Sequence, residues 1–208
     1  MNPSLKRKLK KIIAPIMKLR LKNSDISIIS NNCWGGVFYD KHGLQYKSPT
    51  IGLYFFADDY LKFLNNLKYY LSLDVKSLNI NDSKYKDVLL ERHGENVLLG
   101  QIDDIEIVFL HYDSIDSAIK KWNKRRKRVS FDNIFIKCND QNFFNESNFE
   151  ELKKLNYPKL LITSNHEYKG DFVYFEPKFV NEGYVVNDFK IKYKKLGVYN
   201  IINKLKGE

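Results

Sequence analysis

Cysteine is scarce in this sequence, and its scarcity argues against several classes of protein. Only Cys33 and Cys138 occur among 208 residues, too few for a disulfide framework or a cysteine-rich zinc site. The four histidines show no spacing typical of a metal cluster, so we expect no metal. No apolar run reaches the roughly 18 residues that a membrane-spanning helix needs. The sequence therefore predicts a reduced, cytoplasmic protein without a membrane-spanning segment.

Familiar nucleotide-binding and hydrolase motifs are also missing. The sequence contains no GxxxxGK[ST], GxGxxG, GxSxG or HExxH motif. It therefore gives no support for a P-loop protein, a dinucleotide-binding protein, an α/β-hydrolase with a nucleophile elbow, or a zinc protease. Two Asp-Asp pairs, at residues 58–59 and 103–104, fall in an expected helix and an expected turn. Neither pair therefore supports a metal-dependent glycosyltransferase.

Positive charge is abundant but unevenly placed. The formal net charge is +10, yet residues 1–22 hold eight Lys/Arg and no acid, which leaves +2 for the rest. Apolar residues recur there at helical spacing, so we expect residues 1–23 to form a basic amphipathic helix on an anionic membrane surface. Pro15 is expected to kink or interrupt this helix. The main alternative is a helix docked on its own domain; the nearly neutral body argues against nucleic acid as a partner.

Strands and helices alternate through residues 24–208, which we expect to form one catalytic α/β domain. Apolar residues make up 43% and aromatic residues 14% of the chain, enough for a folded core. The expected strands are residues 25–30, two runs forming a hairpin within 96–112, and 132–139, 158–165 and 171–177. The expected helices are residues 53–73, 114–129, 146–156 and 199–206, and residues 36–50 show aromatic alternation around a turn. This order favours a three-layer fold with a mixed, largely parallel sheet and flanking helices.

Polar clusters follow several expected strands, at the edge where open α/β sheets bind ligands. The first cluster, in residues 30–36 (SNNCWGG), contains Cys33. A thiol becomes a nucleophile beside a base, a cation or a helix N-terminus. The neighbours of Cys33 offer amide donors, close backbone approach to an oxyanion, and an apolar face for a sugar or acyl chain: Asn31, Asn32, Trp34, Gly35 and Gly36. The alternative is a buried packing cysteine beside a tight turn.

A nucleophilic cysteine needs a base, and two histidines stand at expected strand ends. His111 follows the run IEIVFL, and His166 lies beside Glu167. We favour His111 as the base and Asp140, in CNDQN, as the carboxylate that orients it. A core or capping histidine and a turn-forming aspartate are the alternatives. His42 and His93 are interpreted as exposed turn residues, and Cys138 as a packing residue within a strand.

Four motifs in order carry a resemblance to a known family: SNNCWGG, YKSPTIGLYFFADDYLKFLNNLKYYL, IEIVFLHYDSIDSAIKKWNKRRKR and IKCNDQN. Over residues 25–180 the chain resembles a bacterial family catalogued as a domain of unknown function and commonly labelled exopolysaccharide biosynthesis protein. The resemblance implies an α/β fold and a role in capsule, exopolysaccharide or lipopolysaccharide assembly. It places its signature on Asn32, Cys33, Gly35, Gly36, Tyr46, Ser48, Pro49, His111, Tyr112, Trp122, Arg125, Arg126, Asn139 and Asp140.

The signature residues of the expected helix 114–129 suggest an anion site. Trp122, Arg125 and Arg126 would share one helix face, and arginines can hold a phosphate bidentately. Polysaccharide precursors are carried on polyprenyl pyrophosphate at the cytoplasmic leaflet, which this site would suit. Alternatively, Trp122 fills the core and the arginines pair with acids of the same segment.

These observations predict a surface-polysaccharide O-acyltransferase that moves an acetyl group from acetyl-CoA to a hydroxyl of a glycan or lipid-linked sugar. Cys33 or its surrounding amides would perform the acyl chemistry, His111 would act as base and Asp140 would orient it. Substrate would be bound by the neighbours of Cys33 together with Tyr112, Arg125, Arg126 and His166. Transfer of a glycosyl or other sugar substituent, and a non-catalytic membrane-associated glycan-binding role, remain open. The expected location is the cytoplasm, peripheral on the inner face of the plasma membrane.

Overall fold

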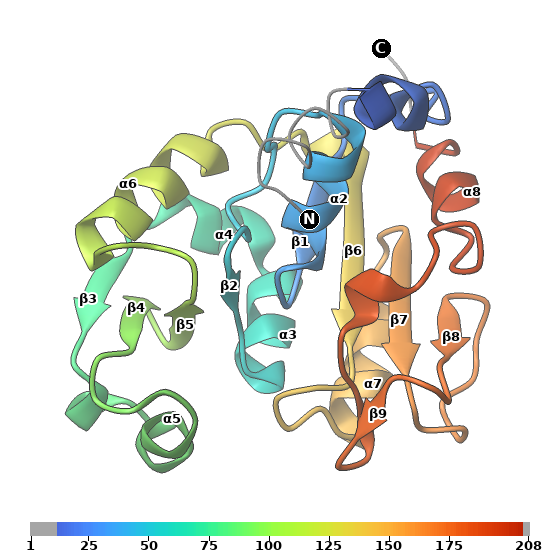
Figure 1. Cartoon of the computed structure of the whole chain (residues 1–208). Coiled ribbons are helices and arrows are strands. Elements are labelled where there is room, and N and C mark those ends of the chain that lie inside the picture. The colour runs from blue at the N-terminus through green and yellow to red at the C-terminus, as the bar shows by residue number, and fades with distance from the viewer. Residues whose placement is uncertain (1–11, 206–208) are drawn as a thin grey trace.

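The computed structural model describes residues 12–205, and its centre is a four-stranded parallel sheet (Figure 1). The strands are β1 (Ser27–Ser30), β6 (Ile134–Asn139), β7 (Lys159–Thr163) and β8 (Val173–Phe175), side by side in that order. Each pairs in parallel with its neighbour. The parallel sheet expected from the alternation of strands and helices is therefore confirmed.

The middle of the chain forms a separate antiparallel sheet in the order β2-β5-β4-β3. Its strands are β2 (Leu53–Tyr54), β3 (Lys76–Leu78), β4 (Leu98–Ile102) and β5 (Ile105–Phe109). β4 and β5 are the expected hairpin, in which Ile102 pairs with Ile105 across a turn that holds Asp103 at a φ of 53°. A short antiparallel pair, β9 (Val180–Asn181) and β10 (Tyr184–Val185), comes later in the chain.

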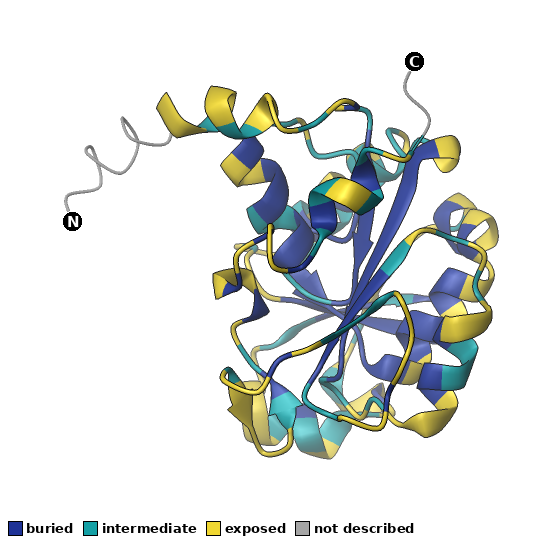
Figure 2. Ribbon diagram, turned by 90° about the vertical axis from the view of Figure 1, so that its right-hand side faces the viewer, coloured by how far each residue is buried: buried dark blue, intermediate teal, exposed yellow. Residues whose placement is uncertain are grey.

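Helices cover both faces of the parallel sheet, in which β1 and β6 are buried throughout and the edge strand β8 is partly exposed (Figure 2). The helices are α2 (Trp34–His42), α3 (Ala57–Asn65), α4 (Leu67–Ser72), α5 (Lys86–His93), α6 (Ile115–Arg126), α7 (Glu146–Lys154) and α8 (Val198–Ile202). Three 3₁₀ turns join them: η1 (Ile80–Asp82), η2 (Phe131–Asn133) and η3 (Asp188–Lys190). The side chain of Ser114 caps α6 by accepting a hydrogen bond from Ser117 N, as expected.

Successive residues of the central strands enter different cores, because side chains alternate across a strand. Ile28 of β1 and Phe135 of β6 belong to the cluster that packs against α2 and α8. Ile29 and Ile136 face the other way, into the cluster that contains residues of α3, α6 and α7. Cys138 lies in this second cluster and is fully buried, which agrees with its interpretation as a packing residue.

Two local expectations were wrong. Residues 34–42 form the helix α2, where aromatic alternation around a turn was expected. The buried side chains of this helix, Trp34, Phe38, Tyr39 and His42, share one face at helical spacing, but Gly35 and Gly36 in its first turn are poor helix formers and weaken the helical pattern of the sequence. The expected single helix over 53–73 is divided into β2, α3 and α4, because Leu53 and Tyr54 pair with β5 and the backbone breaks at Asn66, with φ −134° and ψ 47°.

The basic helix expected over residues 1–23 falls partly outside the described residues, which begin at 12. Residues 12–18 are helical through Pro15. Likewise, residue 206 of the expected C-terminal helix lies outside the described range, within which α8 forms. Between residues 12 and 205, no helix combines the length and apolar character needed to cross a bilayer.

Candidate functional site

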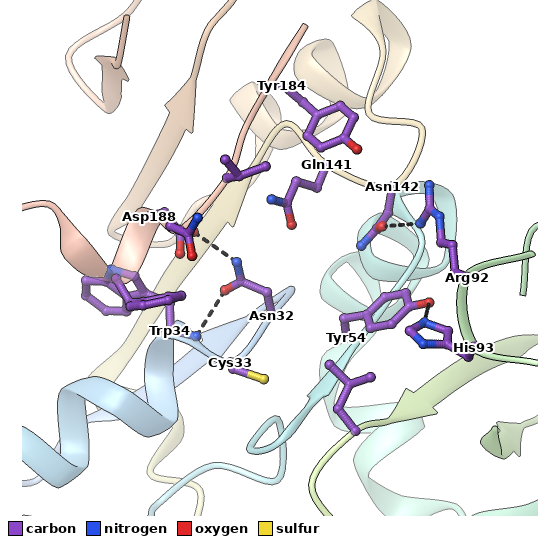
Figure 3. A pocket seen from close by; sticks show the side chains of 14 residues that line it. Asn32, Cys33, Trp34, Tyr54, Arg92, His93, Gln141, Asn142, Tyr184 and Asp188 are labelled. Atoms are coloured by element: carbon purple, nitrogen blue, oxygen red, sulfur yellow. Dashed lines mark hydrogen bonds between the residues drawn. The ribbon is translucent and has the colours of Figure 1, made fainter. Parts of the chain in front are cut away.

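A cavity of about 470 Å³ lies beyond the carboxyl ends of β1 and β6, where α/β sheets bind their ligands (Figure 3). The segments after these two strands contribute Asn32, Cys33, Gln141 and Asn142 to its wall. The facing wall comes from β2 and the end of α5, and the segment from β10 to η3 completes the cavity. Polar residues predicted at separate strand ends therefore meet in one place.

Cys33 stands at the N-cap of α2 and is half-buried in the wall of this cavity. Figure 3 shows its sulfur pointing away from Trp34, toward the side that carries Tyr54. The Sγ donates a long hydrogen bond of 3.8 Å to the carbonyl of Leu53. Burial raises the pKa of the Cys33 thiol, the charge of Asp188 raises it further, and Lys137 opposes both. Cys33 is therefore a neutral thiol at neutral pH, and it needs a base before it can attack.

The turn around Cys33 is held by the side chains of Ser30, the last residue of β1, and of Asn32. Asn32 Oδ1 accepts a hydrogen bond of 3.1 Å from the N–H of Trp34, and Ser30 Oγ accepts one of 3.2 Å from the N–H of Gly35. A Cβ added at Gly35 would lie 2.8 Å from Ser30 Oγ, so glycine lets the start of α2 pack directly on β1. The N–H groups of Trp34 and Gly35, expected to face a ligand, are thus engaged within the turn.

A buried ion pair lies close to Cys33, and one of its two members, Asp188, lines the cavity. Lys137, on β6, is fully buried and pairs with Asp188 at the start of η3. Lys137 Nζ also donates a hydrogen bond of 3.1 Å to Asn32 Oδ1, while Asn32 Nδ2 donates one of 2.9 Å to Asp188 Oδ2. Asn139 Nδ2 donates a further 3.1 Å bond to the same carboxylate oxygen. This network fixes Asn32, the residue before Cys33, and sequence reasoning missed both of its charged members.

The facing wall holds a tyrosine–histidine pair that sequence reasoning also missed. The hydroxyl of Tyr54, on β2, and Nε2 of His93, at the end of α5, form a hydrogen bond of 3.0 Å. Burial lowers the pKa of His93, and the adjacent Arg92 lowers it further, so this imidazole is neutral at neutral pH. Arg92 Nη1 donates a 2.9 Å hydrogen bond to Asn142 Oδ1, which ties α5 to the end of β6.

Two asparagines in the cavity wall hold backbone conformations that L-residues rarely adopt. Asn142 has a φ of 58° and Asn187 a φ of 55°. Left-handed conformations in residues other than glycine cost free energy and gather at functional sites. Asn142 Nδ2 donates a 3.1 Å hydrogen bond to the carbonyl of Phe55, and this contact helps to hold the loop.

A second cavity of about 280 Å³ brings together five of the predicted site residues: Cys33, Gly36, His111, Tyr112 and Arg125. Arg125 Nη1 donates a 2.8 Å hydrogen bond to the hydroxyl of Tyr112, which in turn donates to the carbonyl of Ile51. Lys121 Nζ lies 5.2 Å from the centre of the Tyr112 ring. His111 is exposed in this cavity, and no hydrogen bond joins it to Cys33 within residues 12–205. Cys33 lines both cavities.

Other predicted site residues point elsewhere. Asp140 accepts hydrogen bonds from the Thr163 hydroxyl at 2.9 Å and from the N–H groups of Ser164 and Val185 at 2.7 Å, so it joins the ends of β6, β7 and β10. Arg126 donates a 2.7 Å hydrogen bond to Asp74. His166 is exposed and pairs with its neighbour Glu167.

Both tryptophans are packing residues. Trp34 is 1% exposed and packs against Phe38, Phe135 and Tyr193, although its edge borders the first cavity. Trp122 is equally buried in the other core cluster. Of the residues expected to contact substrate around Cys33, Asn32 is therefore better placed than Trp34, whose ring is enclosed.

Comparisons with known proteins identify relatives but no activity. A family model described as "Domain of unknown function (DUF1919)" matches residues 4–206. A protein of Haemophilus influenzae named "Uncharacterized protein" is 28% identical over 153 residues, which cover 73% of this chain and 68% of that protein.

Proposed function

The chain belongs to the family described as a domain of unknown function (DUF1919), and we propose that it is an O-acyltransferase of surface-polysaccharide assembly. It would transfer an acyl group, most simply acetyl, from acetyl-CoA to a sugar hydroxyl. The observation that carries this proposal is the position of Cys33, whose thiol lies in the wall between two cavities. The smaller cavity contains Lys121 and Arg125, whereas the larger one is lined by several amide side chains. Such a residue can receive a group from a donor on one side and pass it to an acceptor on the other.

The smaller cavity suits the phosphorylated donor. Arg125 has five N–H donors, of which the contact with Tyr112 uses only a part. Lys121 adds a second cation in the same wall, which also carries one carboxylate, that of Asp40. These groups match the phosphates of coenzyme A, and His111 in the same cavity is placed on the side from which the thioester would approach Cys33.

The larger cavity suits a sugar acceptor. Its wall offers amide groups of Asn32, Gln141 and Asn142, which can both donate to and accept from hydroxyl groups. Tyr54 and Tyr184 add aromatic faces with polar tips. The same wall holds Tyr54 and His93 as a hydrogen-bonded pair, and the neutral imidazole of His93 can accept a proton.

The proposed reaction has two steps. First, His111 takes the proton of the Cys33 thiol, the sulfur attacks the thioester carbonyl of the donor, and coenzyme A leaves as a thiol carrying that proton. Second, the sugar hydroxyl attacks the Cys33 thioester while its proton passes through Tyr54 to His93. The ester is released and the proton returns to the Cys33 sulfur. Asp140, which bonds to strand ends, acts here as a positioning residue for the cavity loops.

The proposal is tested by looking for the Cys33 thioester. The purified chain is incubated with acetyl-CoA without acceptor, and peptides are mapped by mass spectrometry. One acetyl group on Cys33, removed by hydroxylamine, is expected; Cys138 serves as the internal control because it is fully buried. His111→Gln should slow labelling by roughly a hundredfold or more, as expected for loss of a general base.

Two outcomes would contradict acyl transfer. One is an unlabelled Cys33 together with unchanged acetyl content in the polysaccharide of a Cys33→Ala strain. The other is binding of a nucleotide sugar in place of coenzyme A, with a shortened repeat unit when the gene is deleted. The second result would assign the two cavities to glycosyl transfer.

A further inference from the structure

The helix over residues 12–18 is docked on the domain by one side only. Met17 and Leu21 pack against the core cluster beneath α2 and α8, and Ala14 lies close to Gly43, where an added Cβ would come within 3.2 Å. The other side carries large apolar side chains in solvent: Ile12 is 64%, Ile13 43%, Ile16 57% and Leu19 86% exposed. Figure 2 shows this helix as a mainly exposed element at the edge of the molecule. Its outer face therefore lacks a partner within residues 12–205.

Beside this helix lies a cavity of about 340 Å³ whose wall carries five cations and no acid: Arg20, Lys41, Lys190, Lys192 and Lys194. The guanidinium of Arg20 lies 5.7 Å from the Tyr199 ring centre, and Lys41 Nζ lies 5.1 Å from that of Tyr193. The salt bridges within residues 12–205 include none of the five. Their mutual repulsion is thus balanced by no nearby acid of the cavity wall, and an external anion would relieve it.

We propose that these two features form one membrane-binding face, in which the exposed apolar residues enter an anionic leaflet and the cation cavity holds a lipid phosphate. Apolar side chains beside a cationic surface are what the boundary between headgroups and acyl chains favours. A nucleic acid would gain nothing from Leu19 and Ile16, and the rings of Tyr193 and Tyr199 lie under cations rather than open for base stacking. The inference does not depend on the chemistry proposed for Cys33.

This face and the Cys33 cleft lie at opposite ends of one helix. Cys33 caps the start of α2, while Lys41 belongs to its last turn and lines the cation cavity. Nine residues of α-helix span about 13 Å. The two cavities also adjoin at η3, where Phe189 lines the Cys33 cavity and the next residue, Lys190, lines the cation cavity, so a bound membrane would lie close to one side of the Cys33 cavity.

The first test is flotation of the full chain with vesicles. Binding is expected to vesicles that contain phosphatidylglycerol, to weaken as salt rises, and to be absent with phosphatidylcholine alone. Equal binding to both vesicles would refute the electrostatic part of the proposal. Inorganic phosphate that binds the chain without weakening vesicle binding, with chloride at matched ionic strength as the control, would assign the cavity to free phosphate compounds and overturn the lipid-phosphate part of the proposal. Duplex DNA or RNA that displaces the vesicles at matched ionic strength would likewise overturn the proposal.

The second test separates binding through this face from binding that depends only on the net charge of the chain. The triple variant Lys190→Gln, Lys192→Gln, Lys194→Gln should lower the partition coefficient roughly a hundredfold, about fivefold for each lysine near the leaflet. The control triple Lys76→Gln, Lys154→Gln, Lys169→Gln removes the same charge from exposed lysines that do not line the cavity and should keep most of the binding. Equal losses in the two triples would overturn the proposal.

The third test concerns the apolar side. Leu19→Ser and Ile16→Ser remove exposed side chains, so the thermal unfolding midpoint should stay unchanged while vesicle binding falls by at least tenfold. Phe175→Ser, at an exposed apolar residue outside this face, is the matched control. Unchanged binding in the Leu19 and Ile16 variants would show that the helix does not enter the leaflet.

Discussion

Replacing Lys137 by methionine should destabilise the fold strongly, because it would leave the carboxylate of Asp188 buried without its cation. The side chain of Lys137 is 0% exposed and that of Asp188 3% exposed. Asp188 Oδ2 would keep only the amide donors of Asn32 and Asn139, at 2.9 and 3.1 Å. Breaking one side of a buried ion pair costs about 3–5 kcal/mol. This is a large share of the 5–15 kcal/mol by which a typical domain is stable.

The measurement is urea unfolding followed by circular dichroism at neutral pH. A double variant, Lys137→Met with Asp188→Leu, removes both charges and should recover most of the lost free energy of unfolding, since no unpaired charge remains buried. Lys153→Met is the matched control, because Lys153 pairs with Glu150 on the surface and such pairs contribute about 0–1 kcal/mol. If Lys137→Met costs no more than Lys153→Met, or if the double variant is less stable than both single variants, the account of this network is wrong.

Three further predictions follow from the same contacts. The rate at which iodoacetamide alkylates Cys33 should rise with pH, with a midpoint above that of a cysteine peptide measured in parallel, because burial raises the pKa of the thiol. A midpoint below that of the peptide would contradict the described environment of Cys33. Burial also lowers the pKa of His42 from 6.5. As pH falls, His42 is therefore protonated in the unfolded chain before it is protonated in the folded chain. The free energy of unfolding should decrease below about pH 6.5, and this decrease should be smaller in His42→Gln. Identical dependence of the free energy of unfolding on pH in the two proteins would refute this role of His42. Gly35→Ala should cost about 1–3 kcal/mol in urea unfolding, because its Cβ would lie 2.8 Å from Ser30 Oγ, while a neutral effect would mean that the turn adjusts freely.

The sequence predicted the parallel sheet well, because β1, β6 and β7 are apolar runs buried on both faces. It did not predict that β2 to β5 form a sheet of their own. Apolar periodicity identifies which segments are strands, but it carries no information on which strand pairs with which. The pairing of β2 with β5 depends on only two residues, Leu53 and Tyr54, too few to show a period of their own.

The candidate site was also predicted only in part, because the pattern that locates it does not show the direction of each side chain. The rule that ligands bind beyond the ends of parallel strands led to Cys33, Asn32 and Trp34, which line the cavity. Asn31 was wrongly expected there, because it is buried and its side chain bonds to Asn139. The rule does not say which polar residue at a strand end turns inward. After β6, Gln141 and Asn142 face the cavity, whereas Asp140 bonds to neighbouring strand ends.

The missed residues come from distant segments. Asp188 lies 51 positions after Lys137, and nothing in the local sequence links them. One signal was present: a lysine within the apolar run of β6 must find a partner if that strand is buried. His93 reaches the cleft only because α5 and β2 belong to the part of the chain built around the antiparallel sheet, an arrangement that periodicity could not show.

The two cavities share a single lining residue, Cys33, among the residues described. If a thioester forms there, the chain would follow a two-site ping-pong scheme, in which donor and acceptor bind in different cavities, rather than a one-site scheme in which they bind in turn at the same place. Double-reciprocal plots would be parallel, as for any covalent relay. Yet free coenzyme A would compete with acetyl-CoA for the donor cavity and would not compete with the sugar. The reason is that each product would leave through the same cavity that its substrate had entered.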